Sequence, residues 1–143
     1  MQVEAILEEK GDRMVAIRPM VSISDAVEAL DRENIGAVLV TSEAGELLGI
    51  LSERDIIRAL RREGPGALEL TVSDLMTKNL VTCEPDTETE SLMVRMLSER
   101  IRHLPVMRDG TLLGIVSIGD VIKFRLDEFV SGAEALKAYI SHA

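Results

Sequence analysis

Apolar and polar positions follow one another along this chain in an order that predicts strand, helix, strand, strand and helix. Residues 14–17, 37–40 and 47–51 are short apolar runs, which is the pattern of buried strands. Between the first two runs, apolar residues at helical spacing share one face of a predicted helix, for which Ser24 is the expected N-cap. Ser52 begins the next helix. This order is typical of a small sheet that carries its helices on one side.

The same order of elements returns in the second half of the chain. Its three predicted strands are 80–83, 104–107 and 112–116. The helix after the first of them is predicted to open with a capping box of Thr87 and Glu90. Asp109 and Gly110 separate the other two strands, and this dipeptide favours the type I′ turn of a β-hairpin.

The two halves also share sequence. Residues 49–57 read GILSERDII, and residues 114–122 read GIVSIGDVI. Further matches pair 15–19 with 81–85, 33–35 with 99–101, and 45–49 with 110–114, once the first copy is allowed one extra residue in its turn. The duplication predicts two quasi-equivalent halves that bury their apolar faces against each other and present similar chemistry at their junction.

A break of glycine and proline at residues 64–66 separates the halves. The expected units are a first repeat over 1–66 with an N-terminal helix packed on it, a second repeat over 67–128, and a helical tail over 129–143. Ser131 and Glu134 are expected to open the tail helix as a capping box. We expect its apolar stripe to pack against the body or a second subunit; a dedicated partner-binding helix is the alternative.

Composition and charge exclude several classes of function. The 143 residues, 46% of them hydrophobic, suit one compact module, and the net charge of −9 argues against a nucleic-acid partner. No apolar run approaches the roughly 18 residues that cross a bilayer, and the amino terminus lacks a signal-peptide core, so we expect a cytoplasmic protein without membrane insertion. Cys83, the single cysteine, is expected to be a buried thiol. Two histidines without neighbouring ligands give a metal site no support.

Two serine and aspartate pairs stand where a buried strand ends and a helix begins. Ser52 with Asp55, and Ser117 with Asp120, have the spacing of a capping box, and this is the structural interpretation. The functional interpretation is that the open helix N-terminus attracts a phosphate while the aspartate accepts hydrogen bonds from a ribose diol.

The two copies differ in their basic residues, so we expect unequal sites. Arg54 of the first copy aligns with Gly119 of the second. Gly36 and Ala37 of the first copy align with Arg102 and His103 of the second. An arginine beside the aspartate can bind a phosphate with two hydrogen bonds. Solvation at the surface is the alternative for Arg102, and a hydrogen-bonding role is expected for His103.

These paired motifs resemble those of tandem cystathionine-beta-synthase (CBS) domains. The resemblance rests on residues 35–40 (IGAVLV) with 49–55, and on residues 102–106 (RHLPV) with 114–120. Residues 74–77 (DLMT) are similar to the connector of that family. The resemblance implies an α/β (α+β) fold of two pseudo-symmetric β-α-β-β-α repeats packed through small sheets, followed here by a C-terminal helix.

The resemblance also implies a function. Such modules are regulatory and bind adenosyl ligands in clefts between the repeats; we expect AMP first, with ATP, ADP, NAD(H) or S-adenosylmethionine as alternatives. The family's ribose-binding positions correspond to Asp55 and Asp120, and the serines three residues earlier correspond to Ser52 and Ser117. The resemblance places the adenine pocket at Val15, Ala16, Val81 and Thr82. It places the phosphate-binding positions at Arg102 and His103. A homodimer and an unidentified regulated partner are expected as well.

Two other functions are alternatives to this hypothesis. The first is a structural module that dimerises or binds a protein through its helices and has vestigial clefts. The second, an enzyme, is the weakest, because no catalytic triad and no P-loop are present in the sequence. We expect a nucleotide to raise the melting temperature of a sensor, and Asp120→Ala to remove most of that gain.

Overall fold

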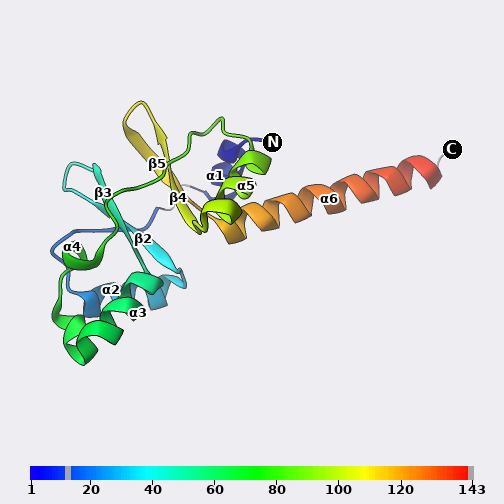
Figure 1. The fold of residues 1–143 in the computed structure, drawn as a ribbon. Coiled ribbons are helices and arrows are strands. Elements are labelled where there is room, and N and C mark those ends of the chain that lie inside the picture. The colour runs from blue at the N-terminus through cyan, green and yellow to red at the C-terminus, as the bar shows by residue number, and fades with distance from the viewer. Residues whose placement is uncertain (12–13, 142–143) are drawn as a thin grey trace.

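Two small sheets flanked by helices form the body of the protein (Figure 1). The computed structural model describes residues 1–11 and 14–141. The helices are α1 (Val3–Lys10), α2 (Ile23–Glu33), α3 (Glu53–Glu63), α4 (Val72–Leu75), α5 (Thr89–Glu99) and α6 (Ile118–Ser141), with a 3-10 helix, η1 (Gly64–Glu69), after α3. The strands are β1 (Ala16–Ile17), β2 (Ala37–Thr41), β3 (Leu47–Ser52), β4 (His103–Arg108) and β5 (Thr111–Ser117). The predicted fold class of two mixed repeats and a C-terminal helix is confirmed.

The first repeat contains the three-stranded sheet. Strand β1 pairs in parallel with β2, which pairs antiparallel with β3. Helix α2 covers this sheet because Ile23, Ala26 and Leu30 form one buried face. The predicted cap at Ser24 is wrong by two residues: Ser22 is the N-cap, and its Oγ accepts a hydrogen bond of 3.1 Å from the Asp25 amide. Both serines have the right chemistry, and only the backbone decides which one precedes the first turn.

The second repeat contains the β4–β5 hairpin. Its turn has positive φ at both central residues, 51° at Asp109 and 78° at Gly110, which confirms the predicted type I′ geometry. The predicted strand at 80–83 is wrong as a continuous element. Only Cys83 pairs, in a parallel bridge to Val106, so this segment runs as an extended linker past the sheet edge.

The predicted capping box at the start of α5 is also wrong. Glu88 is the N-cap, and it forms no side-chain cap. Thr87 Oγ1 instead accepts a hydrogen bond of 3.1 Å from the Glu84 amide and so closes the preceding turn. A threonine can bond backbone amides on either side of a turn, which is why spacing alone misplaced it.

Helix α1 packs on the second repeat, which corrects the prediction that it packs on the first. The amide of Val3 donates to the Thr87 carbonyl at 2.9 Å. Val3 and Ile6 are buried with Leu92 and Met96 of α5 in one core cluster. The apolar spacing of a helix predicts that one face is covered, but it does not say by which surface.

The two repeats meet through their sheets. Ala37, Leu39 and Ile50 of the first sheet form a cluster against which the partly buried Leu112 and Ile115 of β5 pack. Strand β2 is therefore buried on both faces, consistent with its uninterrupted apolar sequence.

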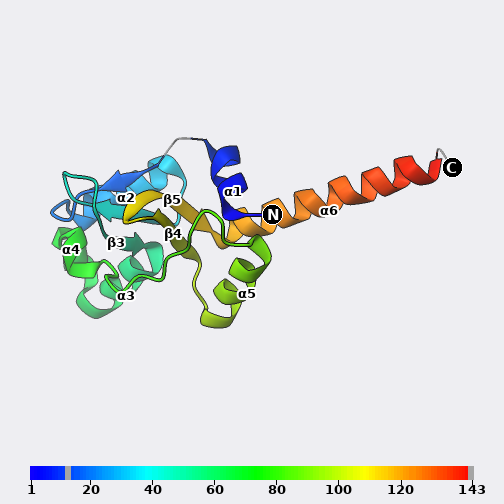
Figure 2. The same ribbon diagram turned by 90° about the horizontal axis from the view of Figure 1, so that it is seen from above.

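Helix α6 is one continuous helix, so the predicted separate tail helix opened by Ser131 and Glu134 is wrong. No proline interrupts residues 118–141, and a lone Gly132 weakens an exposed helix without ending it. Val121 is buried against the second repeat, whereas every residue from 129 to 141 is exposed. Figure 2 shows the helix extending away from the body.

Candidate functional site

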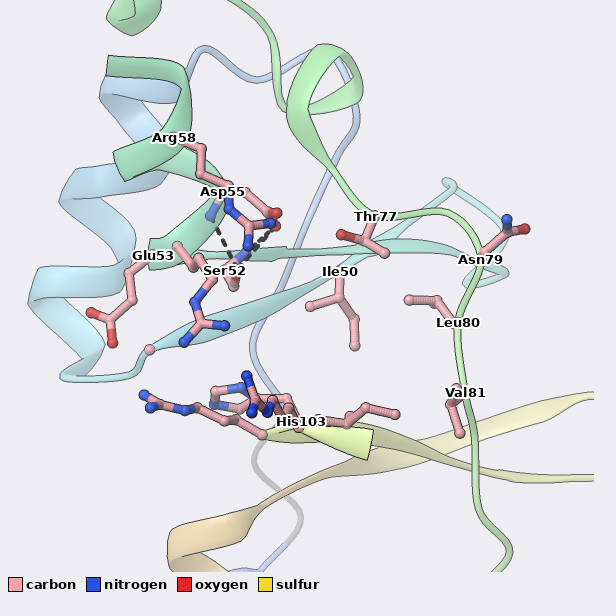
Figure 3. A pocket seen from close by; sticks show the side chains of 15 residues that line it. Ile50, Ser52, Glu53, Asp55, Arg58, Thr77, Asn79, Leu80, Val81 and His103 are labelled. Atoms are coloured by element: carbon pink, nitrogen blue, oxygen red, sulfur yellow. Dashed lines mark hydrogen bonds between the residues drawn. The ribbon is translucent and has the colours of Figure 1, made fainter. Parts of the chain in front are cut away.

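A cavity of about 370 Å³ lies between the two repeats, bounded on one side by the N-terminus of α3 and on the other by the start of β4 (Figure 3). The linker between the repeats forms its third wall. The residues that line it are Gly36, Ile50, Ser52, Glu53, Arg54, Asp55, Arg58, Thr77, Asn79, Leu80, Val81, Arg100, Ile101, Arg102 and His103. The volume is in the range of small-molecule sites, near its lower end.

Ser52 and Asp55 form the predicted capping box at one edge of this cavity. The Ser52 amide donates to Oδ2 of Asp55 at 2.9 Å, and the Asp55 amide donates to Oγ of Ser52 at 3.3 Å. Ser52 Oγ also lies 3.0 Å from the same carboxylate oxygen. Within the described part of the chain, both bonds to the Asp55 carboxylate reach Oδ2, so Oδ1 keeps its acceptor capacity for a ligand.

Four arginines line the same cavity as this aspartate. Arg54 and Arg58 belong to α3, and Arg100 and Arg102 come from the other repeat. Arg58 lies three positions after Asp55, so it shares that face of the helix; this spacing was available in the sequence and was missed. Arg100 caps the end of α5 with a positive φ of 57°, and no local signal directs it to the cavity.

His103 begins β4 and faces the same cavity (Figure 3). Burial lowers its pKa, and the carboxylates of Asp120 and Glu53 oppose this only in part, because Lys10 and Arg102 act in the same direction as burial. Across the cavity, a Cβ placed on Gly36 would lie 3.0 Å from Glu53 Oε1 and 3.7 Å from the His103 ring. Gly36 therefore leaves room between the two repeats where a larger residue would close it.

The structure brings half of the predicted site residues into this one cavity. They are Gly36, Ser52, Arg54, Asp55, Val81, Arg102 and His103. In the aligned repeats, Arg102 and His103 of the second copy take the positions of Gly36 and Ala37 in the first. In space the basic pair of the second repeat faces the aspartate of the first, so the cavity is composite.

The other predicted residues lie elsewhere. Ala37 is buried between the two sheets, and Ala16 of β1 pairs with Leu39 of β2. Val15 packs against the core of the first repeat, and Thr82 is exposed. Because residues 80–83 form a linker, only Val81 of the predicted adenine wall reaches the cavity. Ile50, Asn79, Leu80 and Ile101 also line the cavity, and no motif in the sequence marks their apolar and amide groups as site residues.

The second serine and aspartate pair is engaged differently. The Ser117 amide donates to Oδ2 of Asp120 at 2.9 Å, and the Asp120 amide donates to Oγ of Ser117 at 3.0 Å. Lys10 of α1 adds a hydrogen bond of 2.7 Å to the same Oδ2. Burial would raise the pKa of Asp120, but the bonds from Lys10 and Ser117 outweigh it and hold that pKa below its ordinary value.

Lys10 also donates a hydrogen bond of 2.9 Å to the Ile115 carbonyl. Its ammonium group thus bridges the end of β5 and the start of α6. Gly119, which takes the place of Arg54 in this repeat, supplies no side-chain donor there. The two carboxylates therefore both turn onto their own main chain, yet they differ in surroundings: an open cavity adjoins Asp55, and a lysine covers Asp120.

Comparison with known proteins agrees with this architecture. The model of the CBS domain matches residues 11–62 and again residues 72–127. The chain belongs to the CBS domain family. Its two copies form a CBS-domain pair, as the resemblance implied.

Solved CBS structures resemble the chain closely. The CBS-domain containing protein ATU1752 from Agrobacterium tumefaciens superposes with a TM-score of 0.84 and 44% identity over 87% of this chain and 99% of that one. The CBS domain pair of protein MJ0100, in complex with 5′-methylthioadenosine and S-adenosyl-L-methionine, superposes with a TM-score of 0.78 and 26% identity over 90% of this chain and 98% of that one. The CBS domain pair of MJ0100 thus binds adenosine-containing ligands.

A relative from Arabidopsis thaliana, the CBS domain-containing protein CBSX3, mitochondrial, is 37% identical over 83% of this chain. The chain spans 60% of the length of that protein. The relative is mitochondrial by name, so a cytoplasmic location for this CBS-domain pair stays a prediction of its sequence. Among residues 1–11 and 14–141, no helix is long and apolar enough to cross a membrane.

Proposed function

We propose that this CBS-domain pair is a regulatory sensor that binds an adenine nucleotide, AMP first, in the cavity beside Asp55. The observation that carries the proposal is the composite cavity itself, which is lined by a carboxylate at a helix N-terminus and by four arginines contributed by both repeats. A carboxylate oxygen can accept hydrogen bonds from a ribose diol, and arginines can bind phosphate with paired donors.

The apolar wall suits an adenine ring. Ile50, Leu80 and Val81 lie together on one side of the cavity, away from Arg58 of α3 (Figure 3). Thr77 and Asn79 of the linker add hydrogen-bonding groups at its edge. A ligand with an apolar ring, a diol and an anionic end would match these three parts of the cavity in order.

Charge favours a nucleotide over S-adenosylmethionine. Four arginines outnumber the two acids that line the cavity, Glu53 and Asp55. A ligand that carries a sulfonium and an ammonium would place positive charge among them, whereas phosphates would neutralise them. The modest volume favours AMP over the larger dinucleotide NAD(H).

Binding in this place would couple the repeats. The nucleotide would touch α3 of the first repeat and the start of β4 in the second, so its affinity would depend on how the repeats are spaced. We propose that this spacing is what a regulated protein, still unidentified, detects. No residue of the chain is catalytic in this proposal. The aspartates bind the nucleotide and cap helices.

A structural module that associates through its helices is the second candidate. It is favoured by one observation: Lys10 already bonds the carboxylate of Asp120, so one of the two family sites is satisfied without any ligand. A homodimer is compatible with both candidates.

Calorimetric titration with AMP, ATP and S-adenosylmethionine tests the proposal. We expect AMP to bind, and Asp55→Ala to weaken it about 10- to 100-fold, as expected for a lost hydrogen bond to a charged group. Asp74→Ala is the matched control, because Asp74 forms the same capping box with Thr71 but does not line the cavity. Absence of binding at millimolar nucleotide, or equal affinity in Asp55→Ala and the parent, would contradict the proposal.

A further inference from the structure

Helix α6 carries a heptad pattern that the CBS-pair function does not use. Apolar residues recur along it at alternating intervals of four and three, which is the a/d pattern of a coiled coil. They are Ile122, Leu126, Phe129, Ala133, Leu136 and Ile140; we call this set the α6 stripe. The CBS domain match ends at residue 127, so most of the stripe lies outside the residues that match the family model.

The body of the protein does not cover the α6 stripe. Phe129 is 75% exposed, Leu136 59% and Ile140 64%. The helix contacts the second repeat through another side, on which Val121 is buried and Phe124 packs on the core. Apolar side chains exposed in a continuous row on a projecting helix mark an interaction surface.

We propose that the α6 stripe is an interface between two copies of this chain, whose α6 helices pair antiparallel. In this orientation a and d positions face each other, so Ile122 lies opposite Ile140 of the partner subunit and Leu126 opposite Leu136 of the partner subunit. Phe129 then lies opposite Ala133 of the partner subunit, so that the largest residue of the row fills the space left by the smallest.

A parallel pair would fit less well. It would place Phe129 against the same residue of the partner and Ala133 against its own copy, which crowds one layer and leaves a void in the next. The antiparallel register also sets Arg125 near Tyr139 of the partner subunit, where a cation–π contact is available. The same register brings Lys123 near Lys137 of the partner subunit, so salt should strengthen the dimer slightly.

The exposed area is sufficient for a stable dimer. A buried Phe or Tyr contributes roughly 150–250 Å², and Phe129 and Tyr139 are each about three-quarters exposed. The exposed aliphatic side chains beside them are Ile122, Leu126, Val130, Leu136 and Ile140. Together with Val130 and Tyr139, which flank it, the α6 stripe exposes on the order of 800 Å² per copy, comparable to the contribution of each partner to an interface of standard size.

Sedimentation equilibrium of the full chain at micromolar concentration tests the interface. We expect a dimer whose dissociation constant rises at least about 100-fold in Phe129→Glu, because each dimer loses two central aromatic contacts and buries two charges. Leu136→Glu should act alike, and Ala138→Glu, on the exposed opposite side of the same helix, should leave the dimer intact. Circular dichroism checks that each variant is folded.

Cysteine crosslinking tests the orientation. A mixture of Leu126→Cys and Leu136→Cys chains should form a disulfide between unlike chains, and neither variant alone should do so. A parent chain that is monomeric, a dimer unaffected by Phe129→Glu, or crosslinking of Leu126→Cys chains to each other would overturn the proposal. A monomer that binds phospholipid vesicles through the stripe would overturn it as well.

Discussion

Lys10 in α1 donates a hydrogen bond of 2.7 Å to Oδ2 of Asp120, 110 positions later in the chain. The contact exists because α1 crosses to the second repeat and covers the end of β5 there. Asp120 and Asp55 occupy matching positions of the duplicated sequence, yet only Asp55 lines the open cavity between the repeats. The duplication therefore does not produce two equal sites.

We expect Lys10→Met to free the carboxylate of Asp120 for a ligand. If Lys10 is what blocks the second site, the number of AMP molecules bound per chain should rise from one toward two in calorimetric titration. The variant keeps the aliphatic part of the side chain and removes only the ammonium group. Arg32→Met, which removes an exposed charge from α2, is the control and should still bind one. An unchanged stoichiometry in Lys10→Met would show that the lysine is not the block.

The equivalent glycines of the two repeats should respond differently to substitution. A Cβ at Gly49 would lie 2.8 Å from the Thr77 carbonyl oxygen, which is part of the backbone and cannot move alone. At Gly114 the contact is 3.0 Å to the end of the flexible Leu7 side chain. We expect Gly49→Ala to lower the free energy of unfolding by about 1–3 kcal/mol and Gly114→Ala to cost clearly less. Urea unfolding measures both, and equal losses would argue against this packing.

The stability of the protein should depend on pH through His103. Its pKa in the folded state is below the ordinary value of 6.5 because the ring is buried. In the interval between the two pKa values the unfolded chain binds a proton that the folded chain does not, so the free energy of unfolding falls as the pH drops below 6.5 and levels off below the lowered pKa. The slope attributable to His103 is at most one proton per chain.

His103→Asn should remove this part of the pH dependence. Urea unfolding of the parent and the variant across this pH interval measures the difference between their slopes. Bound AMP should also reduce the pH dependence of the free energy of unfolding in the parent protein, because a phosphate near the His103 ring favours its protonated form. Parallel pH profiles of parent and variant would contradict the assignment to His103.

Cys83 should be unreactive in the folded protein. Burial raises the pKa of its thiol to about 11 from an ordinary 9.0, so the thiolate fraction at neutral pH is about 100-fold smaller than for a free cysteine. The side chain is also buried at the point where the linker bridges to β4. Alkylation by iodoacetamide, followed by mass spectrometry, should be slow until denaturant is added. Rapid alkylation of the folded chain would show that this edge of the second repeat opens readily.

Local features were predictable because they depend on residues close together in the chain. The capping boxes of Ser52 with Asp55 and of Ser117 with Asp120 span three positions, and the Asp109-Gly110 turn spans two. Even so, serine or threonine spacing misplaced the start of two helices, because Ser24 and Thr87 can bond backbone amides in more than one conformation.

The sequence by itself determined the duplication, the strands and helices of each half apart from the strand at 80–83 and the separate tail helix, and the serine and aspartate pairs at two helix starts. Each of these depends on periodicity or on neighbours within one turn. Only the tertiary structure decided that α1 covers the second repeat, that Lys10 reaches Asp120, and that Arg102 and His103 face Asp55. Those contacts join residues far apart in the chain. Apolar spacing requires that a face be buried but does not specify its partner, so such contacts depend on how whole elements pack.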